Sequence, residues 1–283
     1  MPENEFSIRT MSPQEVNFAV DLAANEGWNP GLHDADAFFA ADPGGFLLGE
    51  LDGEPIATIS VVEYGDDFGF LGFYIVRPGF RGQGFGLAMW NAGMQRLAGR
   101  NIGLDGVVDQ QPNYRKSGFQ LAYRNVRYEG RSGGVAPDDG ALVDLSTVPA
   151  QQVYAYDRRF FPAERRRFLE AWLQQPASVA LGIIDEGVLK GYGLVRSCRS
   201  GFKIGPLFAD TPDRAETLFR GLCAKVEPDQ PVYLDVPEPN RSAVALAERA
   251  KMHVVFETAR MYTGPAPDLP LQQLFGVTSF ELG

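Results

Sequence analysis

The chain has 283 residues, of which 45% are hydrophobic, and a formal net charge of −10 at pH 7. This length suits two domains with cores of their own, and the acidic balance disfavours nucleic-acid binding, which depends on basic surfaces. No apolar run is long enough to cross a membrane, residues 1–5 lack the features of a secretory signal, and two cysteines make no disulfide framework. We therefore expect a cytoplasmic protein that binds neither nucleic acid nor membrane.

The negative charge is concentrated near the start of the chain. Residues 1–67 contain fourteen acidic residues and one basic residue, Arg9. Because a surface of one sign concentrates the opposite charge around it, this segment suits a cationic amine substrate. A surface that only keeps the protein in solution is the alternative.

The first 128 residues alternate between strand and helix patterns. After a short strand over 6–9, Ser12-Pro13-Gln14-Glu15 has the capping box and early proline of a helix start, so a helix is expected to about Asn25. Asp52-Gly53 between two apolar runs predicts a β-hairpin. The other elements expected here are a helix over 34–41, strands over 46–51, 55–62, 68–76, 102–108 and 120–128, and a helix that follows Gly86 and ends near Gly99. The strand over 120–128 is expected to close the first domain.

Three alternating glycines lie between the strand over 68–76 and the next helix, in Arg81-Gly82-Gln83-Gly84-Phe85-Gly86. They leave no side chains between the backbone N–H groups and a ligand, and the helix that follows offers unpaired donors and a positive dipole end. We expect that helix to bury Leu87, Trp90, Met94 and Leu97 on one face. The stretch therefore predicts a cradle for a pyrophosphate.

Spacing excludes two common phosphate loops. The dinucleotide fingerprint needs a third glycine where Leu87 stands, and a Walker A motif is absent. The remaining pattern, R-G-x-G-x-G with Pro78 three residues earlier, resembles the acetyl-CoA loop of the GNAT superfamily of N-acetyltransferases. The resemblance implies an α/β fold with a central mixed sheet flanked by helices. It also implies acetyl-CoA as co-substrate, with no metal.

The resemblance assigns cofactor contacts by position. The strand would bind the pantetheine arm through Tyr74, Ile75 and Val76. The pyrophosphate would lie on the loop and the start of the helix, and Arg81 would add a charge-assisted contact to a phosphate. The loop and helix residues predicted to bind it are Gly82, Gln83, Gly84, Phe85, Gly86 and Leu87.

Residues 113–119 resemble the second GNAT signature, Y-x-x-x-G-F. The resemblance implies that the Tyr114 hydroxyl donates a proton to the departing CoA thiolate, and a phenol with a pKa near 10 is protonated at pH 7. Tyr114 is the predicted catalytic residue. Asn113 is a predicted cofactor contact, although Gln110-Gln111-Pro112 departs from the Asn-x-x-Ala that often precedes this tyrosine in the family, which leaves the role of Asn113 open.

No carboxylate lies on the strand over 70–76, where many relatives carry the base that deprotonates the amine. Asp105, Glu63, Glu26 and His33 are candidates, and proton loss to water is an equal alternative. The base is therefore not assigned from the sequence.

Acceptor specificity in this fold usually comes from the first helices and the loop that joins them. Glu26, Trp28 and Asn29 lie there, and Trp28 could stack on a substrate cation or ring. Tyr154, Asp157 and Phe161 open the second half and could cover the site. The predicted acceptor residues are Glu26, Trp28, Asn29, Asp105 and Asp157.

The second half repeats the first in altered form. A Gly-, Pro- and Asp-rich stretch ends near Ala141, so we divide the chain into a catalytic domain (1–130), a linker (131–141) and a second domain (142–283). The second domain is expected to contain a helix over 160–173, with Arg165-Arg166-Arg167 on its solvated face, a hairpin around Glu186-Gly187, strands over 204–210 and 232–236, and a helix over 240–249. Thr211-Pro212 replaces the glycines, and Lys251-Met252 replaces Gly118-Phe119. This arrangement resembles tandem GNAT proteins with a degenerate C-terminal domain.

These observations favour an acetyl-CoA-dependent N-acetyltransferase that acts on a small primary amine. Neither Cys198 nor Cys223 lies beside a histidine, so we expect direct attack in a ternary complex without an acyl-enzyme. The histidines and cysteines are also too scattered for a zinc site. A CoA-binding sensor or scaffold without turnover, and a protein lysine or N-terminal acetyltransferase, are the alternatives. Monomer and homodimer both remain open.

Overall fold

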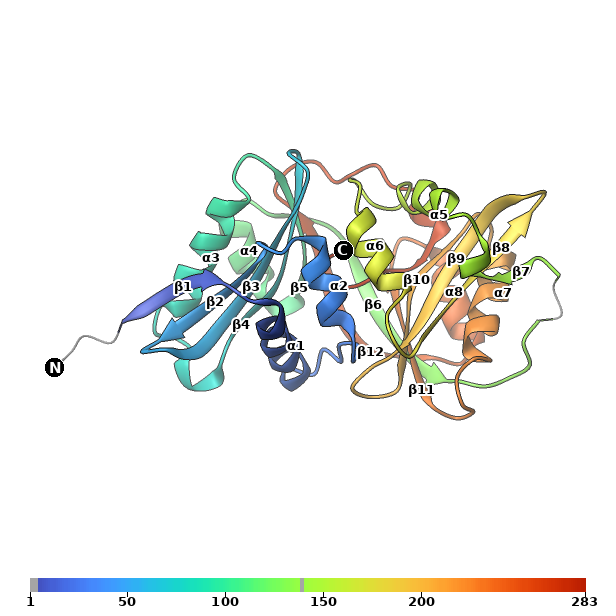
Figure 1. Ribbon diagram of the computed structural model, residues 1–283, viewed down its shortest axis with the longest axis horizontal. Helices are drawn as coiled ribbons and strands as arrows, with labels where there is room; N and C mark the ends of the chain where they lie inside the picture. The colour runs from blue at the N-terminus through green and yellow to red at the C-terminus, as the bar shows by residue number, and fades with distance from the viewer. Residues whose placement is uncertain (1–4, 138–139) are drawn as a thin grey trace.

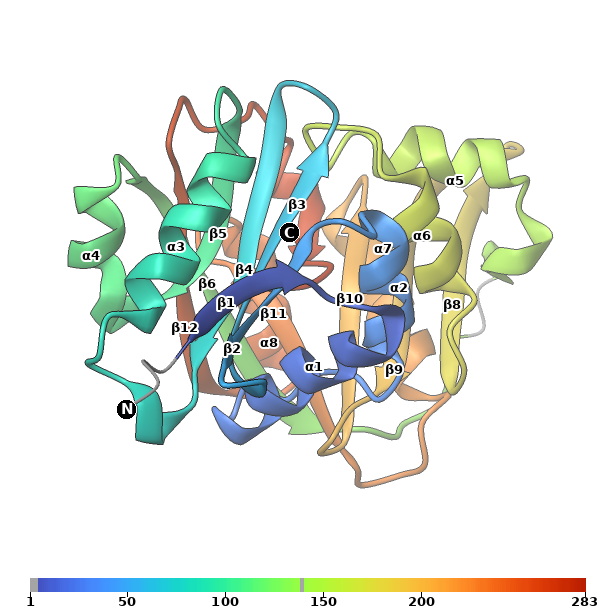
Figure 2. The same cartoon turned by 60° about the vertical axis from the view of Figure 1, so that its left-hand side comes forward.

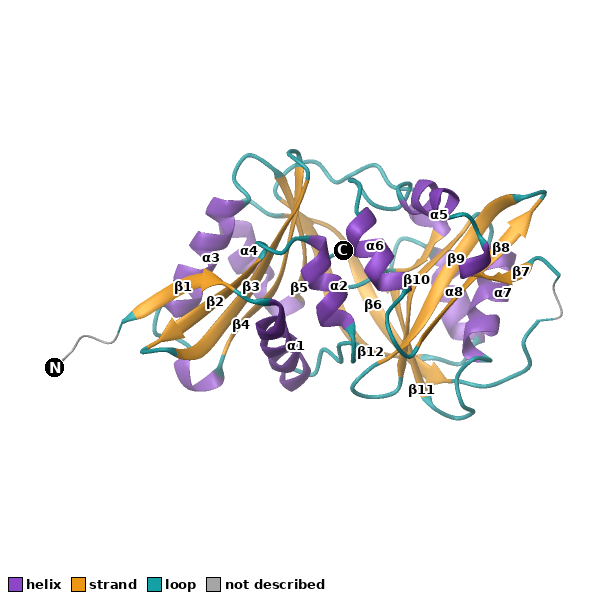
Figure 3. Ribbon diagram, viewed as in Figure 1, coloured by secondary structure: helices purple, strands orange, loops and turns teal. Residues whose placement is uncertain are grey.

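One mixed sheet extends through both halves of the protein, and helices pack on its faces (Figures 1 and 3). The computed structural model describes residues 5–137 and 140–283, so expectations for residues 1–4 and 138–139 lie outside the described residues. Among the described strands the order is β1-β2-β3-β4-β5-β12-β6-β11-β10-β9-β8-β7, with β13 paired to β10. The predicted α/β class with a mixed sheet is confirmed.

The elements of the first half follow the predicted order. Its strands are β1 (Phe6–Thr10), β2 (Phe46–Leu51), β3 (Glu54–Tyr64), β4 (Phe68–Val76), β5 (Asn101–Val107) and β6 (Gln120–Arg131). Its helices are α1 (Val16–Asn25), α2 (Asp34–Ala41), α3 (Phe85–Arg96) and α4 (Gln111–Lys116). Glu15 accepts hydrogen bonds from the Ser12 N–H and hydroxyl at 2.8 Å each, which confirms the predicted helix start.

The second half has the same succession of elements. Its strands are β7 (Leu142–Asp144), β8 (Ser178–Asp185), β9 (Val188–Ser197), β10 (Phe202–Ala209), β11 (Pro231–Pro237), β12 (His253–Tyr262) and β13 (Leu274–Gly276). Its helices are α5 (Ala150–Asp157), α6 (Arg166–Leu173), α7 (Pro212–Cys223) and α8 (Arg241–Arg249). Both predicted hairpins are present, and the turn residues Asp52-Gly53 and Glu186-Gly187 all have the positive φ that such turns require.

The two halves exchange strands. β12, from the second half, lies between β5 and β6, while β6, from the first half, lies between β12 and β11. The strand expected over 120–128 is present as β6, but it pairs with β12 and β11 of the second half. The pattern of residues identifies a strand, but its neighbours are set by contacts far along the chain. As a result, Thr258 of β12 is opposite Val107 on one side and Asn125 on the other.

Helices cover both faces of the first half. α3 lies on one face of the strands, and α1 and α2 lie on the other (Figure 2). Because side chains alternate along a strand, Leu47 packs under α3 whereas Phe46 packs under α1 and α2. Phe38 of α2 stacks on Trp172 of α6 at 5.8 Å between ring centroids, so these helices join the halves.

Two helix expectations are wrong. The predicted helix over 160–173 begins only at Arg166, because Phe160 and Phe161 are buried in the core as a non-helical segment and Arg165 pairs with Asp157 at 2.7 Å. Arg165 is thus buried, not on a solvated face. α5 was not predicted. Trp90 of α3 and Leu97, which follows its last residue, are buried, but Leu87 is 64% exposed because it lies in the first turn of the helix beside the glycine loop.

Candidate active site

The strands β4 and β5 separate part-way along their length and leave a cavity. They pair in parallel from Phe68 and Asn101 to Leu71 and Leu104, and no further. A cavity of about 630 Å³ follows, lined by the diverging ends of both strands, the glycine loop and the start of α4. Between Thr58 and Ser60 the register of the β3–β4 pair shifts because β4 has one extra residue, and Phe73 in this bulge has a φ of +45° and bends β4. The bend explains why the strands part.

The glycine loop lines this cavity and has backbone N–H groups that are free to donate hydrogen bonds. Gly82 and Gly84 have φ values of +75° and +91°, which favour glycine, and a Cβ at either position would contact nothing within 4 Å. Across the described chain, the N–H groups of residues 82–87 have no backbone acceptor. This is the geometry that binds anions at a helix start.

Arg81 and Gln83 fix the shape of the loop. The Arg81 guanidinium donates to the Val76 carbonyl at 2.7 Å and forms an ion pair with Glu26. The Gln83 side chain donates to the Gly79 carbonyl at 3.1 Å. Arg81 is therefore already paired, whereas Leu87 is exposed at the cavity wall.

Tyr114 lies at the same cavity, held between a tryptophan and a glycine. Its ring stacks on Trp90 at 5.7 Å and covers Gly106, where a Cβ would approach the tyrosine ring to 2.1 Å. Burial, with a smaller contribution from Tyr74, raises the pKa of Tyr114 to about 12. Its hydroxyl has no hydrogen-bond partner among the residues that the structure describes. A protonated phenol is thus available to a group in the cavity.

The Asn113 side chain is hydrogen-bonded to neighbouring residues of its own turn. Its amide donates to Gln110 at 2.8 Å and its oxygen accepts from Lys116 at 3.1 Å, and it does not line the cavity. Gln110 does line it, on the turn before α4. The sequence offered no signal for Gln110 beyond its place next to the tyrosine motif.

The proposed bases are mostly engaged elsewhere. Asp105 lines the cavity, but its carboxylate accepts from Arg260 at 2.9 and 2.6 Å and from Asn125 at 2.8 Å. Glu26 lines the cavity and pairs with Arg81. Glu63 forms ion pairs with arginines away from the cavity, and His33 precedes α2, also away from it.

Only part of the predicted acceptor set comes together. Trp28 lines the cavity, whereas Asn29 is bonded to the Ser200 backbone at 2.8 and 2.9 Å. Asp157 is buried against Arg165 and Tyr192. Two further residues expected to cover the site do not: Tyr154 donates to Glu170, and Phe161 packs on Tyr64 and Phe68.

The second half reaches the cavity through other residues. Phe256 and Thr258 come from β12, and Phe280 and Glu281 from the segment after β13. Sequence reasoning missed all four, because the pairing of β12 with β5 brings Phe256 and Thr258 to the site and the segment after β13 brings Phe280 and Glu281.

Other kinds of site find little support. Within residues 5–137 and 140–283 there is no group of three or more His, Cys, Asp or Glu side chains arranged for a metal ion. The helices described there include none with the length and hydropathy of a membrane span. Burial raises the pKa of Cys223 to about 12, which keeps its thiol protonated.

Comparison with known proteins identifies the family. Residues 15–119 match the acetyltransferase (GNAT) family and residues 153–276 match an acetyltransferase (GNAT) domain. The chain is also 30% identical to holothin acyltransferase from Pseudoalteromonas sp. (strain SANK 73390), over 98% of this chain and 95% of that protein. The chain belongs to the GNAT acetyltransferase family.

Two solved structures share the fold of this chain over nearly its whole length. A proposed acetyltransferase from Pyrococcus horikoshii superposes with a TM-score of 0.84 at 23% identity, covering 100% of this chain and 98% of that one. A tandem GNAT protein from the clavulanic acid biosynthesis pathway superposes with a TM-score of 0.62 at 13% identity, covering 93% and 100%. At these identities the likeness concerns the fold. The prediction of two GNAT domains in one chain is confirmed.

Proposed function

We propose that this GNAT protein is an N-acetyltransferase that moves the acetyl group of acetyl-CoA to a primary amine on a small molecule. The observation that carries the proposal is that one cavity is lined by Gly82, Gly84, Gly86 and Leu87, whose N–H groups have no backbone acceptor in the described chain, and by Tyr114, whose hydroxyl has no partner there. The similarity to an enzyme named as an acyltransferase supports acyl transfer as the reaction class.

The residues present fit acetyl-CoA. The N–H groups of the glycine loop would hold its pyrophosphate, since they are fixed in place before a ligand arrives. Beyond Leu71, β4 has no strand paired on its β5 side in the described chain. The backbone of residues 72–76 could therefore hydrogen-bond with the amides of the pantetheine arm of acetyl-CoA. When bound, acetyl-CoA supplies an activated thioester.

Tyr114 would act on the leaving group. As the amine nitrogen forms the C–N bond, the C–S bond breaks and the Tyr114 hydroxyl passes its proton to the sulfur. The nitrogen releases a proton to solvent, and the phenol regains one from solvent. Because its pKa is near 12, the hydroxyl is protonated throughout the neutral range.

The test has two parts. Calorimetry should show one acetyl-CoA bound per chain, and a panel of alkylamines, arylamines, polyamines and aminoglycosides should release CoA thiol with at least one acceptor. Binding without thiol release from any amine would favour the sensor or scaffold instead. Absence of binding would contradict the cradle.

A further inference from the structure

The segment after β13 places Glu281 at the fork where β4 and β5 part. The Glu281 carbonyl lies against Gly72, where a Cβ would approach it to 2.1 Å. Gly72 is the first residue of β4 beyond the parallel pairing, which ends at Leu71, and a side chain there would displace the segment. Glu281 lines the cavity together with Gly72.

Both halves of the protein hold this segment in place. In the second half, the Val277 N–H donates to the Asp235 carbonyl at 2.8 Å. From the first half, the Tyr64 hydroxyl donates to the Leu282 carbonyl at 3.2 Å. The backbone on both sides of Glu281 is thus fixed before any acceptor binds, which lowers the entropic cost of binding.

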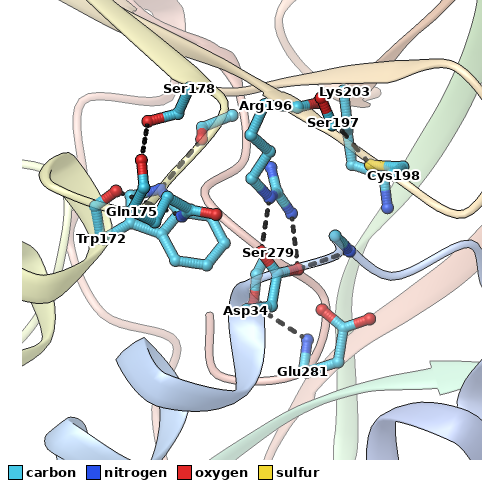
Figure 4. A network of polar contacts seen from close by, with 12 residues as sticks. Asp34, Trp172, Gln175, Ser178, Arg196, Ser197, Cys198, Lys203, Ser279 and Glu281 are labelled. Atoms are coloured by element: carbon cyan, nitrogen blue, oxygen red, sulfur yellow. Dashed lines mark hydrogen bonds and ion pairs between the residues drawn. The ribbon is translucent and has the colours of Figure 1, made fainter.

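The Glu281 carboxylate is buried and has no partner among the residues that the structure describes. The residue is 3% exposed, and its N–H donates to the Ser279 hydroxyl at 3.2 Å, but no hydrogen bond or ion pair reaches either carboxylate oxygen (Figure 4). Unlike the enclosed Ser60 and Thr258 hydroxyls, which also lack a partner, both oxygens keep accessible surface, and the cavity provides it. Glutamate is ionised at pH 7, and a buried carboxylate without a partner is costly. A cation that enters the cavity would therefore be stabilised there.

The charged groups around this carboxylate contact other partners. Arg127 pairs with Asp235 at 2.6 Å, and Arg196 pairs with Asp34 at 2.8 Å. Lys203 donates to a backbone carbonyl at 2.9 Å, and burial lowers its pKa. The charged and titratable groups that surround the carboxylate from α2, β6, β9, β10, β11 and the residue after β9 are Asp34, Arg127, Arg196, Lys203, Asp235 and Cys198.

The Glu281 segment and Tyr114 approach the fork from opposite faces of the sheet. Leu71 packs under α3, as Tyr114 does, and because side chains alternate along a strand, a Cβ on Gly72 points to the other face, toward the Glu281 carbonyl. Tyr114 covers Gly106, two residues beyond the end of the parallel pairing on β5. A protonated phenol and an unpaired carboxylate therefore flank one fork.

We propose that Glu281 binds the acceptor as an ammonium ion and takes a proton from it before attack, which makes the acceptor an aliphatic primary amine. The inference rests on the proposed function. An alkylammonium has a pKa of about 10, as lysine does, so at pH 7 the free amine must be generated in the site. Glu26 and Asp105 also line the cavity, but both are paired with arginines. Among the described carboxylates that line the cavity, Glu281 is the one without a partner.

The proton balance follows from these roles. One N–H bond of the ammonium breaks, its proton forms an O–H bond on Glu281, and the electron pair stays on nitrogen. The amine then forms the C–N bond while the C–S bond breaks, and Tyr114 passes its proton to the sulfur. The nitrogen and Glu281 each release a proton to solvent and Tyr114 regains one, so each turnover releases one proton.

The test uses the alkylamine of the panel that is acetylated fastest. With saturating acetyl-CoA, kcat/KM at pH 7 is measured from CoA thiol release for the native protein and for Glu281→Gln, which keeps the size of the side chain and removes its charge. Glu281→Gln should lower kcat/KM by about 10²–10³-fold, the range for losing a general base. Calorimetry with CoA present, which cannot react, should show the same alkylamine binding at least about tenfold more weakly, because the buried charge loses its partner. Acetyl-CoA affinity should not change.

Glu257→Gln is the matched control. Glu257 lies on β12 between Phe256 and Thr258, which line the cavity, but its own carboxylate pairs with Arg124 at 3.2 Å and does not line the cavity. This variant should change kcat/KM by less than about twofold, because an exposed ion pair contributes little.

The pH dependence separates a base from a structural role. In the native protein Glu281 takes the proton from the ammonium form, which predominates below a pKa of about 10, so kcat/KM should vary by less than about threefold between pH 7 and 9. In Glu281→Gln only the free amine reacts, so kcat/KM should rise about tenfold per pH unit over the same range. The neighbouring Lys203 and Cys198 are present in both proteins, so the difference between the profiles reports Glu281.

Three results would overturn this inference and leave the proposed function standing. They are a loss in Glu281→Gln that stays constant from pH 7 to 9, a native profile that itself rises about tenfold per pH unit, and acetylation of arylamines but of no alkylamine. The native profile needs no variant, so it decides the question even if Glu281→Gln fails to fold. No thiol release from any amine of the panel would overturn the proposed function as well.

Discussion

The cleft between β4 and β5 is open, whereas the matching cleft between β10 and β11 is filled by the chain itself. Both strand pairs are parallel and both separate part-way, after Leu71 and Leu104 in the first half and after Ile204 and Leu234 in the second. In the second half β13 pairs with β10 at the point where the strands part. The first cleft holds a cavity there instead.

The helices that follow the two clefts also begin differently. α3 begins after Gly84, without a side-chain cap, so its first N–H groups remain free. α7 begins after Thr211, whose hydroxyl accepts from the Arg214 N–H at 3.4 Å. A helix start that is satisfied by its own cap has less to offer an anion.

The position of Tyr114 differs between the halves as well. Phe119 donates to the Tyr114 carbonyl at 3.2 Å, and the corresponding Met252 donates to the Ala247 carbonyl at 3.0 Å. Ala247 therefore stands where the first half has Tyr114. The comparison teaches that the same succession of elements serves two purposes. The first cleft remains open as a cavity, whereas the second cleft binds β13, and Phe280 and Glu281, which follow β13, line the first cavity.

The largest effect is expected from blocking the open cleft. Gly84→Arg places a long side chain over the free N–H groups at the loop and should weaken acetyl-CoA binding by more than about 100-fold, measured by calorimetry. Gly65→Arg is the control, since Gly65 also has a positive φ and open space but lies on the turn between β3 and β4. Equal affinity in both variants would contradict the cradle.

The next largest effect is expected from removing the Tyr114 hydroxyl, which has no counterpart in the second half. Tyr114→Phe keeps the ring on Trp90 and should lower kcat by about 10²–10³-fold, the range for losing a general acid, with acetyl-CoA affinity unchanged. Tyr154→Phe loses a hydroxyl that donates to Glu170 away from the cleft and should change kcat by less than about twofold. Unchanged turnover in Tyr114→Phe would remove this residue from the mechanism.

Emptying part of the second cleft should destabilise the fold without creating a second site. Leu274 of β13 is buried, so Leu274→Ala should lower the free energy of unfolding by about 2–4 kcal/mol in urea denaturation. The stoichiometry of acetyl-CoA should stay at one per chain, because Thr211 caps α7 and Ala247 replaces the tyrosine. Two bound acetyl-CoA molecules would show that β13 alone closes the second cleft.

The smallest effect should come from the cap of α7. Thr211→Ala removes the hydroxyl that accepts from Arg214 and should lower the free energy of unfolding by about 1 kcal/mol, followed by thermal or urea denaturation. Acetyl-CoA affinity at the first cleft should not change. A large loss of that affinity would mean that the two clefts are coupled in a way that their separate helix starts do not explain.

Local patterns in the sequence predicted the elements that local interactions decide. The turns at Asp52-Gly53 and Glu186-Gly187 need positive φ, which those residues tolerate, and the free donors at Gly82 to Gly86 follow from missing side chains. The failures occur where burial overrides local preference. Arg165 looked like part of a solvated basic run, yet Asp157 compensates its charge in the core.

By itself, the sequence determined the order of strands and helices in the first half, the open helix start at residues 82–87, the tyrosine motif that follows it and part of the repeated plan in the second half. Only the tertiary structure decided which strands lie side by side, because pairing depends on residues far apart in the chain: β12 enters beside β5 and β13 fills the second cleft. It thereby decided one wall of the cavity, since Phe256 and Phe280 lie more than 140 residues after Tyr114 in the chain and reach the cavity only through these arrangements.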